Sequence, residues 1–347
     1  MIYKLLAVSK NSNIGVNIGD YIQALASSQF YPSIDGFLDR DKDLKGYDGE
    51  PCKMIMNGWY MHEPSNWPPS ERIIPLFVAF HLNSTAKDQM LTEEGISYLK
   101  RHEPIGCRDT HTQQILNSHG IDAYFSGCMT LTLGKKFHSD EKDDRIYIVD
   151  PPINSRLDIR HILLALTEAL THPTDIYKLY RTKHLNLHHG RNWIKKALKT
   201  ALYYREYCKM FGRNTVMGAT YICQEDTYYK NRLGTDEERL KEAERLVRLY
   251  AKAKMVITSR IHCALPCLGL ETPVIYIEKA QDVEESSCRM GGLINLFNVV
   301  KIGNGVLKPT FEVKTPITAD NIPKNKGAWK KLSESLCSRC ESFINQS

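Results

Sequence analysis

The chain has 347 residues, 42% of them apolar, and a formal net charge of +6. That length is enough for two domains with separate cores, and no apolar run approaches the roughly 20 residues that a membrane-crossing helix needs. The first ten residues, MIYKLLAVSK, hold too short an apolar run for a secretory signal, and the cysteines are scattered rather than spaced as a disulfide framework. We therefore expect a cytoplasmic protein.

The first part of the chain alternates between strand-like apolar runs and helical patterns. Strands are predicted at residues 3–8, 53–56, 73–80 and 104–107, and helices at 21–30, 93–101 and 112–119. This alternation predicts a mostly parallel sheet, because each crossover helix returns the chain to begin the next strand in the same direction.

A second series of the same kind begins at Arg145. Strands are predicted at residues 145–152, 215–223, 255–257 and 273–277, and helices at 157–170, 236–254, 261–269 and 326–347. A polar stretch, GKKFHSDEKDD, separates the two series. We expect an α/β fold with two Rossmann-like domains: an N-terminal domain at 1–140, a C-terminal domain at 141–325 and a C-terminal helix at 326–347.

Arginine and histidine interrupt the apolar stretch MVITSRIHCALPCLGLETPVIYI at residues 255–277. Ser259, Arg260 and His262 lie between a predicted strand and the start of a predicted helix. Ligands bind at this edge of open α/β sheets, and free N–H groups at a helix start attract anions. The pattern favours a phosphate or carboxylate site. The alternative is a surface arginine beside a packed histidine.

Five ordered motifs resemble the polysaccharide pyruvyl transferase family over nearly the whole chain. They are NIGDYIQALA from Asn17, PIGCRDTHTQQILNSHGI (104–121), SGCMTLTL (126–133), the stretch at 251–277 with its Ser-Arg-X-His sequence, and RMGGL (289–293). The resemblance implies two Rossmann-like domains facing a cleft, as in GT-B glycosyltransferases. It also implies transfer of the enolpyruvyl unit of phosphoenolpyruvate to two sugar hydroxyls. The products are a pyruvate ketal and phosphate, made during assembly of capsular or exopolysaccharide.

The resemblance also assigns residues to the donor site. Arg260 and His262 match the family's Arg-X-His motif, and Arg108 matches its arginine before a first-domain helix. Two arginines can hold the donor's carboxylate and phosphate bidentately from opposite walls of the cleft. His262 is a suitable general acid or base. Ser259 and His81 are further donor-site candidates, although His81 also fits a core position.

Acceptor-binding candidates follow two predicted first-domain strands. Asn17, Gly19 and Asp20 occupy the first strand-to-helix turn, where Asp20 fits helix capping as well as sugar binding. Asn57 and Trp59 follow the second strand, where an indole face can stack on a sugar. Residues 172–222 match no motif of the family, so the resemblance gives no acceptor identity.

We expect neither a metal ion nor a cofactor. The carboxylates of DRDKD (39–43) fit a solvated loop, Cys337 and Cys340 form a single CxxC without a second pair, and HLNLHHG (184–190) lies among cations. A Walker loop, a GxGxxG fingerprint and a GxSxG motif are all missing from the sequence. Two rivals stay open: a GT-B-type glycosyltransferase that uses a nucleotide sugar, and a non-catalytic scaffold of an assembly complex.

A basic segment requires a separate explanation. Ten Lys/Arg and one acid lie between Lys178 and Arg213, and residues 191–209 have a helical pattern with a basic row at 191, 195 and 199. Four aromatic residues, Trp193, Tyr203, Tyr204 and Tyr207, suit a membrane interface. We expect either an anionic membrane contact through 191–209 or a helix that packs on the second domain. Nucleic acid is not expected, because no recognition motif accompanies the segment.

Overall fold

The computed structural model describes the whole chain except residues 9–15, 154–156, 186, 188–191, 225, 230, 280–287, 289 and 347. Arg191 and Arg289, named above, lie outside the described residues. None of the helices in the described part of the chain has the length and apolarity needed to span a bilayer.

The first sheet is parallel throughout, and its strands follow one another in chain order from one edge. Its order is β1 (Ile2–Tyr3), β4 (Cys52–Tyr60), β5 (Ile73–Leu82), β6 (Ile105–Cys107) and β7 (Ala123–Phe125). The strand predicted at 3–8 is split: β2 (Leu5–Ala7) pairs instead with β3 (Phe37–Asp39). The first segment of the chain therefore has β4 as its neighbour along β1 and β3 as its neighbour along β2. The helix that follows starts at a topological switch point, where ligands bind in α/β sheets.

In the second sheet the strand order itself reverses. Its order is β13 (Val306–Pro309), β12 (Asn298–Gly303), β11 (Val274–Lys279), β10 (Met255–Thr258), β8 (Ile146–Val149) and β9 (Thr220–Ile222). Only the β12–β13 pairing is antiparallel. Since β8 has β9 on one side and β10 on the other, the switch point lies at the carboxyl ends of β8 and β10. The α/β class with parallel sheets is confirmed.

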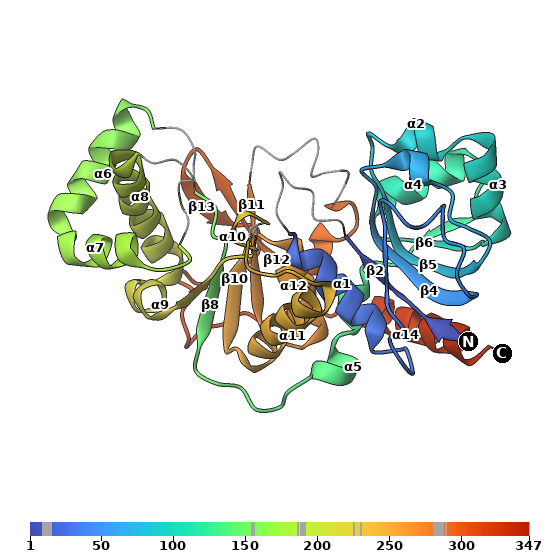
Figure 1. Ribbon diagram of the computed structural model, residues 1–347. Helices are drawn as coiled ribbons and strands as arrows, with labels where there is room; N and C mark the ends of the chain where they lie inside the picture. The colour runs from blue at the N-terminus through green and yellow to red at the C-terminus, as the bar shows by residue number, and fades with distance from the viewer. Residues whose placement is uncertain are drawn as a thin grey trace.

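Three helices lie between the sheets: α1 (Ile18–Ser28), α11 (Asp236–Lys252) and α12 (Ile261–Gly269) (Figure 1). Alternate residues of each sheet face this layer, so Val78 from β5 and Val256 from β10 belong to one continuous apolar core. A polar contact adds to it, because Tyr21 donates to Asp236 over 2.6 Å and accepts from Arg239 over 2.9 Å. The two halves of the chain therefore share a core.

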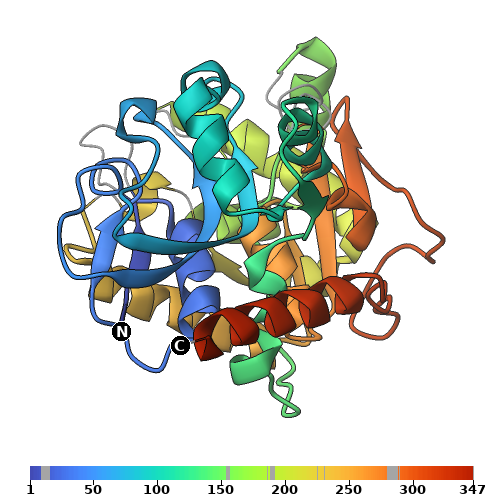
Figure 2. The same ribbon diagram turned by 90° about the vertical axis from the view of Figure 1, so that its right-hand side faces the viewer.

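The predicted C-terminal helix is confirmed as α14 (Trp329–Asn345), and it packs on the first sheet. Lys53 donates its ammonium to the carbonyl of Phe343 over 2.8 Å, and Lys135 pairs with Glu341 over 2.6 Å. Figure 2 shows α14 running along the first sheet, with the two ends of the chain close together. The chain thus returns to its first half after forming the second sheet.

Shorter helices complete the first half. They are α2 (Lys87–Met90), α3 (Glu93–Arg101), α4 (Thr110–Ser118), α5 (Gly134–Phe137) and the 3-10 turns at Pro64–Asn66 and Met129–Thr132. Thr92 caps α3 and Asp109 caps α4, each accepting a backbone N–H of the first turn. A 3-10 turn at Ile294–Leu296 and α10 (Asp226–Tyr229) belong to the second half.

Four helices form what we call the helical lobe, which covers the outer face of the second sheet: α6 (Ile159–Thr171), α7 (Pro173–Arg181), α8 (Trp193–Phe211) and α9 (Arg213–Gly218) (Figure 1). The strand predicted at 215–223 was wrong in its first half, which is α9. The membrane role predicted for the aromatic residues of α8 is also wrong in part. Tyr203, Tyr204 and Tyr207 are buried in the core beneath the lobe, because α6, α7 and the sheet cover α8.

Candidate active site

Arg260 lies at the carboxyl end of β10, at the switch point of the second sheet. Its Nε donates to the Asp150 carboxylate over 2.7 Å, and the Ser259 hydroxyl donates to the Asp150 carbonyl over 2.8 Å. The Arg260 side chain is 39% exposed, whereas the Asp150 carboxylate is nearly buried. The ion pair therefore orients the guanidinium and leaves part of it accessible to an anion.

Asp150 is a site residue that the sequence reasoning missed. It directly follows β8, and its carboxylate also accepts the backbone N–H of Gln224 over 2.9 Å. Its φ of 42° is in the left-handed region, which aspartate tolerates better than most residues. The available signal was an acid at the end of a predicted strand, immediately before two prolines.

His262 touches the start of α1, so the two switch points meet. A Cβ added to Gly19 would lie 2.7 Å from His262 Nδ1 and 3.0 Å from His262 Cβ. His262 is buried, and its ψ of 19° departs from helical geometry at the first turn of α12. Only glycine leaves room for the imidazole at this place. The amino-terminal ends of α1 and α12 thus lie together, where their dipoles favour an anion.

The cap of α1 is Asn17 and not Asp20, contrary to the capping role expected for Asp20. The Asn17 side chain accepts the Gly19 N–H over 3.0 Å, while the Asp20 carboxylate accepts from Gln23 Nε2 over 3.2 Å within the first turn. Asn17 and Gly19 are therefore placed beside His262. We call Asn17, Gly19, Asp150, Ser259, Arg260 and His262 the Arg260 cluster.

Asn57 and Trp59, both on β4, already have protein partners. Asn57 is buried, donates to the Gln23 carbonyl over 3.2 Å and accepts from Ser27 Oγ over 2.9 Å, so it fastens β4 to α1. The Trp59 ring lies 4.4 Å from the His62 ring, and the Arg40 guanidinium is 5.2 Å from its centroid.

His81 forms a buried pair with Asp109, at the carboxyl edge of the first sheet. Its Nδ1 lies 2.5 Å from the Asp109 carboxylate, which also accepts the Thr112 N–H over 2.8 Å. Burial raises the pKa of Asp109, but the hydrogen bond and charge of His81, with the charge of Arg108, outweigh it and lower the pKa overall. We call His81, Arg108, Asp109 and Thr112 the His81 cluster.

Arg108 is only 2% exposed, so it does not form an open cleft wall as predicted. Its backbone N–H donates to the Phe80 carbonyl over 2.8 Å, which fixes it to β5. Its charge acts on two buried neighbours, since it lowers the pKa of Asp109 and opposes the burial that raises the pKa of Cys128. Arg108 is thus a buried cation beneath the carboxyl edge of the first sheet.

The RMGGL segment brings the second half of the chain to the His81 cluster. The Thr110 N–H at the start of α4 donates to the Gly291 carbonyl over 3.1 Å. A Cβ on Gly292 would lie 2.8 Å from the Phe125 ring, and its φ of 80° also requires glycine. Motifs far apart in sequence therefore meet at this edge.

Part of the DRDKD segment has a structural role, whereas residues 186 and 188–190 of HLNLHHG lie outside the described residues. In DRDKD, Arg40 and Asp41 form a buried ion pair at 2.8 Å, and Asp41 accepts the His62 N–H over 2.6 Å, so the expectation of a solvated loop was wrong for these two. Within the described ranges, no group of three or more His, Cys, Asp or Glu side chains could hold a metal ion.

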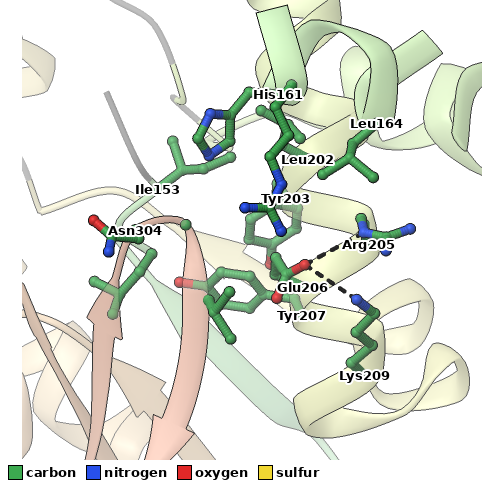
Figure 3. Close-up of a pocket in the computed structure, with 14 residues that line it drawn as sticks. Ile153, His161, Leu164, Leu202, Tyr203, Arg205, Glu206, Tyr207, Lys209 and Asn304 are labelled. Carbon is green, nitrogen blue, oxygen red and sulfur yellow. Dashed lines mark hydrogen bonds and ion pairs between the residues drawn. The ribbon is translucent and has the colours of Figure 1, made fainter. Parts of the chain in front are cut away.

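A separate hollow of about 110 Å³ lies in the helical lobe between α6, α8 and the β12–β13 turn (Figure 3). Glu206 pairs there with Arg205 at 3.5 Å and with Lys209 at 3.3 Å, the two dashed contacts of the figure. No residue predicted for the donor or acceptor site lines this hollow.

Two switch points that meet through buried histidine and glycine, beside an oriented arginine, define an α/β protein whose candidate site lies at its strand ends. Residues 17–278 match the sequence pattern of the polysaccharide pyruvyl transferase family, and the chain belongs to that family. No curated protein matches it in sequence. A functionally uncharacterised protein of Klebsiella pneumoniae has a similar solved structure, with 13% identity, 87% of this chain and 93% of that chain covered, and a TM-score of 0.41.

Proposed function

We propose that this protein transfers the enolpyruvyl group of phosphoenolpyruvate onto two hydroxyls of a sugar, forming a pyruvate ketal in capsular or exopolysaccharide biosynthesis. Family membership supports a pyruvyl transferase acting on polysaccharide. The single observation that carries the donor assignment is the Arg260 cluster: an arginine oriented by Asp150, next to a buried histidine and two helix starts. In this proposal the two halves are GT-B-like domains, and the donor lies where their switch points meet.

Phosphoenolpyruvate suits this cluster because it carries a phosphate and a carboxylate close together. The Arg260 guanidinium can bind either group through two parallel hydrogen bonds, and Asp150 holds it in the required orientation. The starts of α1 and α12 add backbone N–H donors, while the Ser259 hydroxyl, which donates to the Asp150 carbonyl, helps to hold Asp150 in place. In this proposal the buried guanidinium of Arg108 adds a fixed positive charge to the potential at the donor site, while His81 is paired with Asp109.

The reaction needs a proton at the donor's methylene carbon and the departure of phosphate. Protonation makes that carbon a methyl group and leaves an oxocarbenium-like centre, to which the first sugar hydroxyl adds and loses its proton. The second hydroxyl then displaces inorganic phosphate, so one donor and one diol give one ketal and one phosphate. We assign the proton transfers to His262, whose ordinary pKa lies near neutrality.

The acceptor is proposed to lie at the start of α1, near Asn17, Gly19 and Asp20. Asn57 then acts as a positioning residue, because its side chain already holds α1 through Gln23 and Ser27. Trp59 offers its ring at the same edge of the first sheet. The chemistry requires no metal or cofactor, because the donor itself supplies the leaving group. The proposed location is the cytoplasm.

The test is to incubate the protein with phosphoenolpyruvate and candidate sugar acceptors, following phosphate release and the mass of the acceptor. A ketal-bearing product is expected. Turnover only with a nucleotide sugar would assign the site to a glycosyltransferase. No turnover with any donor, together with full biological function of Arg260→Ala and His262→Ala variants, would indicate a scaffold.

Variants separate binding from proton transfer. His262→Ala should lower kcat about 100- to 10,000-fold and leave donor binding nearly unchanged, because proton transfer contributes on that scale. Arg260→Ala should weaken donor binding, and Arg260→Lys should restore only part of it, since lysine cannot bind bidentately. Unchanged turnover in His262→Ala would move the acid–base role elsewhere, with His81 next to be tested.

A further inference from the structure

Exposed apolar side chains are concentrated on the helical lobe. Of the eleven large hydrophobic residues that the described structure exposes, seven lie between residues 159 and 194. Four of them are on α6: Ile159, Leu163, Leu166 and Leu170, which are 78%, 60%, 48% and 82% exposed. We call these four the α6 stripe. A contiguous exposed apolar patch of this kind marks an interaction surface.

The α6 stripe is not needed to hold the helix in place. Its residues are spaced by four, three and four positions, so they share one face of the helix. On the other side, Ala165 is buried in the core beneath the lobe and Leu164 packs against it. Glu168 on that side pairs with Arg205 of α8 over 2.5 Å. The helix is anchored by one face and presents a second apolar face to solvent.

The charges of the helical lobe are also divided between its interior and its surface. Its acids are used internally: Glu168 pairs with Arg205, Asp175 with Arg213 over 2.6 Å, and Glu206 with Lys209. Exposed cations on α6, α7 and α8 have no acid within 4.0 Å in the described part of the chain; they are Arg160, Lys178, Arg181 and Lys195. The lobe therefore presents apolar side chains and unneutralised positive charge together.

We propose that the helical lobe binds the surface of an anionic lipid membrane, with the α6 stripe inserted at the interface. A lipid surface offers an apolar phase and anionic headgroups side by side, which matches this combination. Nucleic acid would supply phosphates for the cations, but it has no apolar phase into which the α6 stripe could insert. A second copy of the chain would bring the same cations against one another. The contact thus centres on α6, and the buried tyrosines of α8 take no part in it.

The inference does not rest on the proposed reaction, but it would serve that reaction. A protein held at a membrane can reach a sugar carried on a membrane lipid. Because the binding experiment contains no donor and no acceptor, its failure and the failure of the enzymatic proposal are distinguishable.

Sedimentation with extruded vesicles tests the proposal on the full chain. Vesicles of phosphatidylcholine are compared with vesicles containing about 30% phosphatidylglycerol, at about 50 mM and about 500 mM NaCl. We expect at least roughly tenfold stronger binding to the anionic vesicles at low salt, and loss of most of that advantage at high salt.

Two matched pairs of variants identify the surface. Leu163→Gln with Leu170→Gln should weaken binding roughly tenfold or more, because each removes apolar area from the interface. Its control is Ile34→Gln with Ile74→Gln, which removes two exposed apolar residues from the first half and should bind like the unaltered protein. Thermal unfolding of both variants shows that each is folded.

Charge variants follow the same design. Lys178→Gln with Arg181→Gln should lose part of the salt-sensitive binding, whereas Lys42→Gln with Lys100→Gln, the same change in net charge on the first half, should not. Equal and weak binding to both kinds of vesicle at low salt would overturn the proposal. So would full binding by the folded α6 variant, dimerisation that the variant abolishes without any vesicle binding, or tight binding to DNA that the variant leaves intact.

Discussion

Replacing Gly19 by alanine tests the contact on which the candidate site depends. The added Cβ would lie 2.7 Å from His262 Nδ1, about 0.7 Å closer than the 3.4 Å at which ordinary contact begins. The clash also involves His262 Cβ and the capping oxygen of Asn17, both at 3.0 Å. Rotating the imidazole cannot relieve the contact with Cβ, so the start of α12 must shift relative to α1.

The clash should change both the free energy of unfolding and the activity. Overpacking a close contact costs about 1–3 kcal/mol, whereas alanine in place of glycine within a helix returns about 1 kcal/mol. We expect a net loss of about 0–2 kcal/mol in the free energy of unfolding. Activity should fall more sharply, because a shift approaching 1 Å in a catalytic group can lower turnover about 100-fold.

A double-mutant cycle isolates the contact. Denaturant unfolding is measured for the unaltered protein, Gly19→Ala, His262→Ala and the double variant. Without the imidazole the 2.7 Å contact is lost and only the two contacts at 3.0 Å remain, so Gly19→Ala should cost less stability than in the unaltered protein. Gly218→Ala, in α9, is the matched control, since a Cβ there meets nothing within 4 Å; it should leave turnover unchanged and should not lower stability.

Additivity in the cycle would refute the reasoning. If Gly19→Ala has the same effect on stability with and without the His262 side chain, the two groups do not press on each other. Full turnover in Gly19→Ala, measured as phosphate release, would show that the precise spacing of α1 and His262 is not required by the reaction.

Four further predictions follow from described contacts. Asp150→Asn should lower kcat/KM for the donor about tenfold while the fold persists, since asparagine tolerates the left-handed φ but leaves Arg260 without its carboxylate; unchanged steady-state kinetics would contradict this. Asp109→Asn should cost about 3 kcal/mol of stability at neutral pH by breaking a buried pair with His81. Because the folded pKa of Asp109 is lowered, this contribution is present above the carboxyl's ordinary pKa and is lost as the pH falls through the folded value; a pH-independent difference in denaturant unfolding would count against it. Tyr21→Phe should destabilise the protein by about 1–3 kcal/mol through loss of the hydroxyl that joins α1 to α11, and an unshifted unfolding midpoint would disprove the bridge. Treatment with EDTA should leave ketal formation unchanged, and restoration of lost activity by a divalent ion would disprove the metal-free chemistry.

Local patterns predicted the elements well where the signal was itself local. The helix expected at 236–254 is α11, and its start is a complete capping box between Thr235 and Glu238. The position of Arg260 between a strand and a helix start was also predictable, because it depends only on two neighbouring apolar runs. The split of the first strand was not, since it results from pairing with β3 on one side and β4 on the other.

The partners within the site could not be predicted in the same way. Asp150 and Arg260 are 110 residues apart, and Gly19 meets His262 only because two sheets share one layer of helices. Asn57 occupied a position suited to a ligand, but α1 consumes its hydrogen-bonding capacity. In each case the decisive fact is which segment packs opposite, and no single stretch of sequence contains it.

The basic segment shows the same limit on a larger scale. The aromatic residues of α8 have the composition of an interfacial helix, yet Tyr203 and Tyr207 are enclosed from two sides. Most of the apolar surface left outside belongs to α6, and on α8 only its first residues, Trp193 and Ile194, add to it. Amphipathicity reveals that a helix has two kinds of face, but the neighbours decide which of them meets water.

The apolar core that runs from the first sheet to the second also limits how the molecule can move. Swinging the halves apart would expose side chains of α1, α11 and α12 to water, at about 25 cal/mol for each Å² uncovered. Wide hinge opening during each catalytic cycle is therefore unfavourable. Under the proposed function, the groups at the two switch points would keep a nearly constant separation while reactants enter and leave, so discrimination between donors would depend on a preformed spacing of charges.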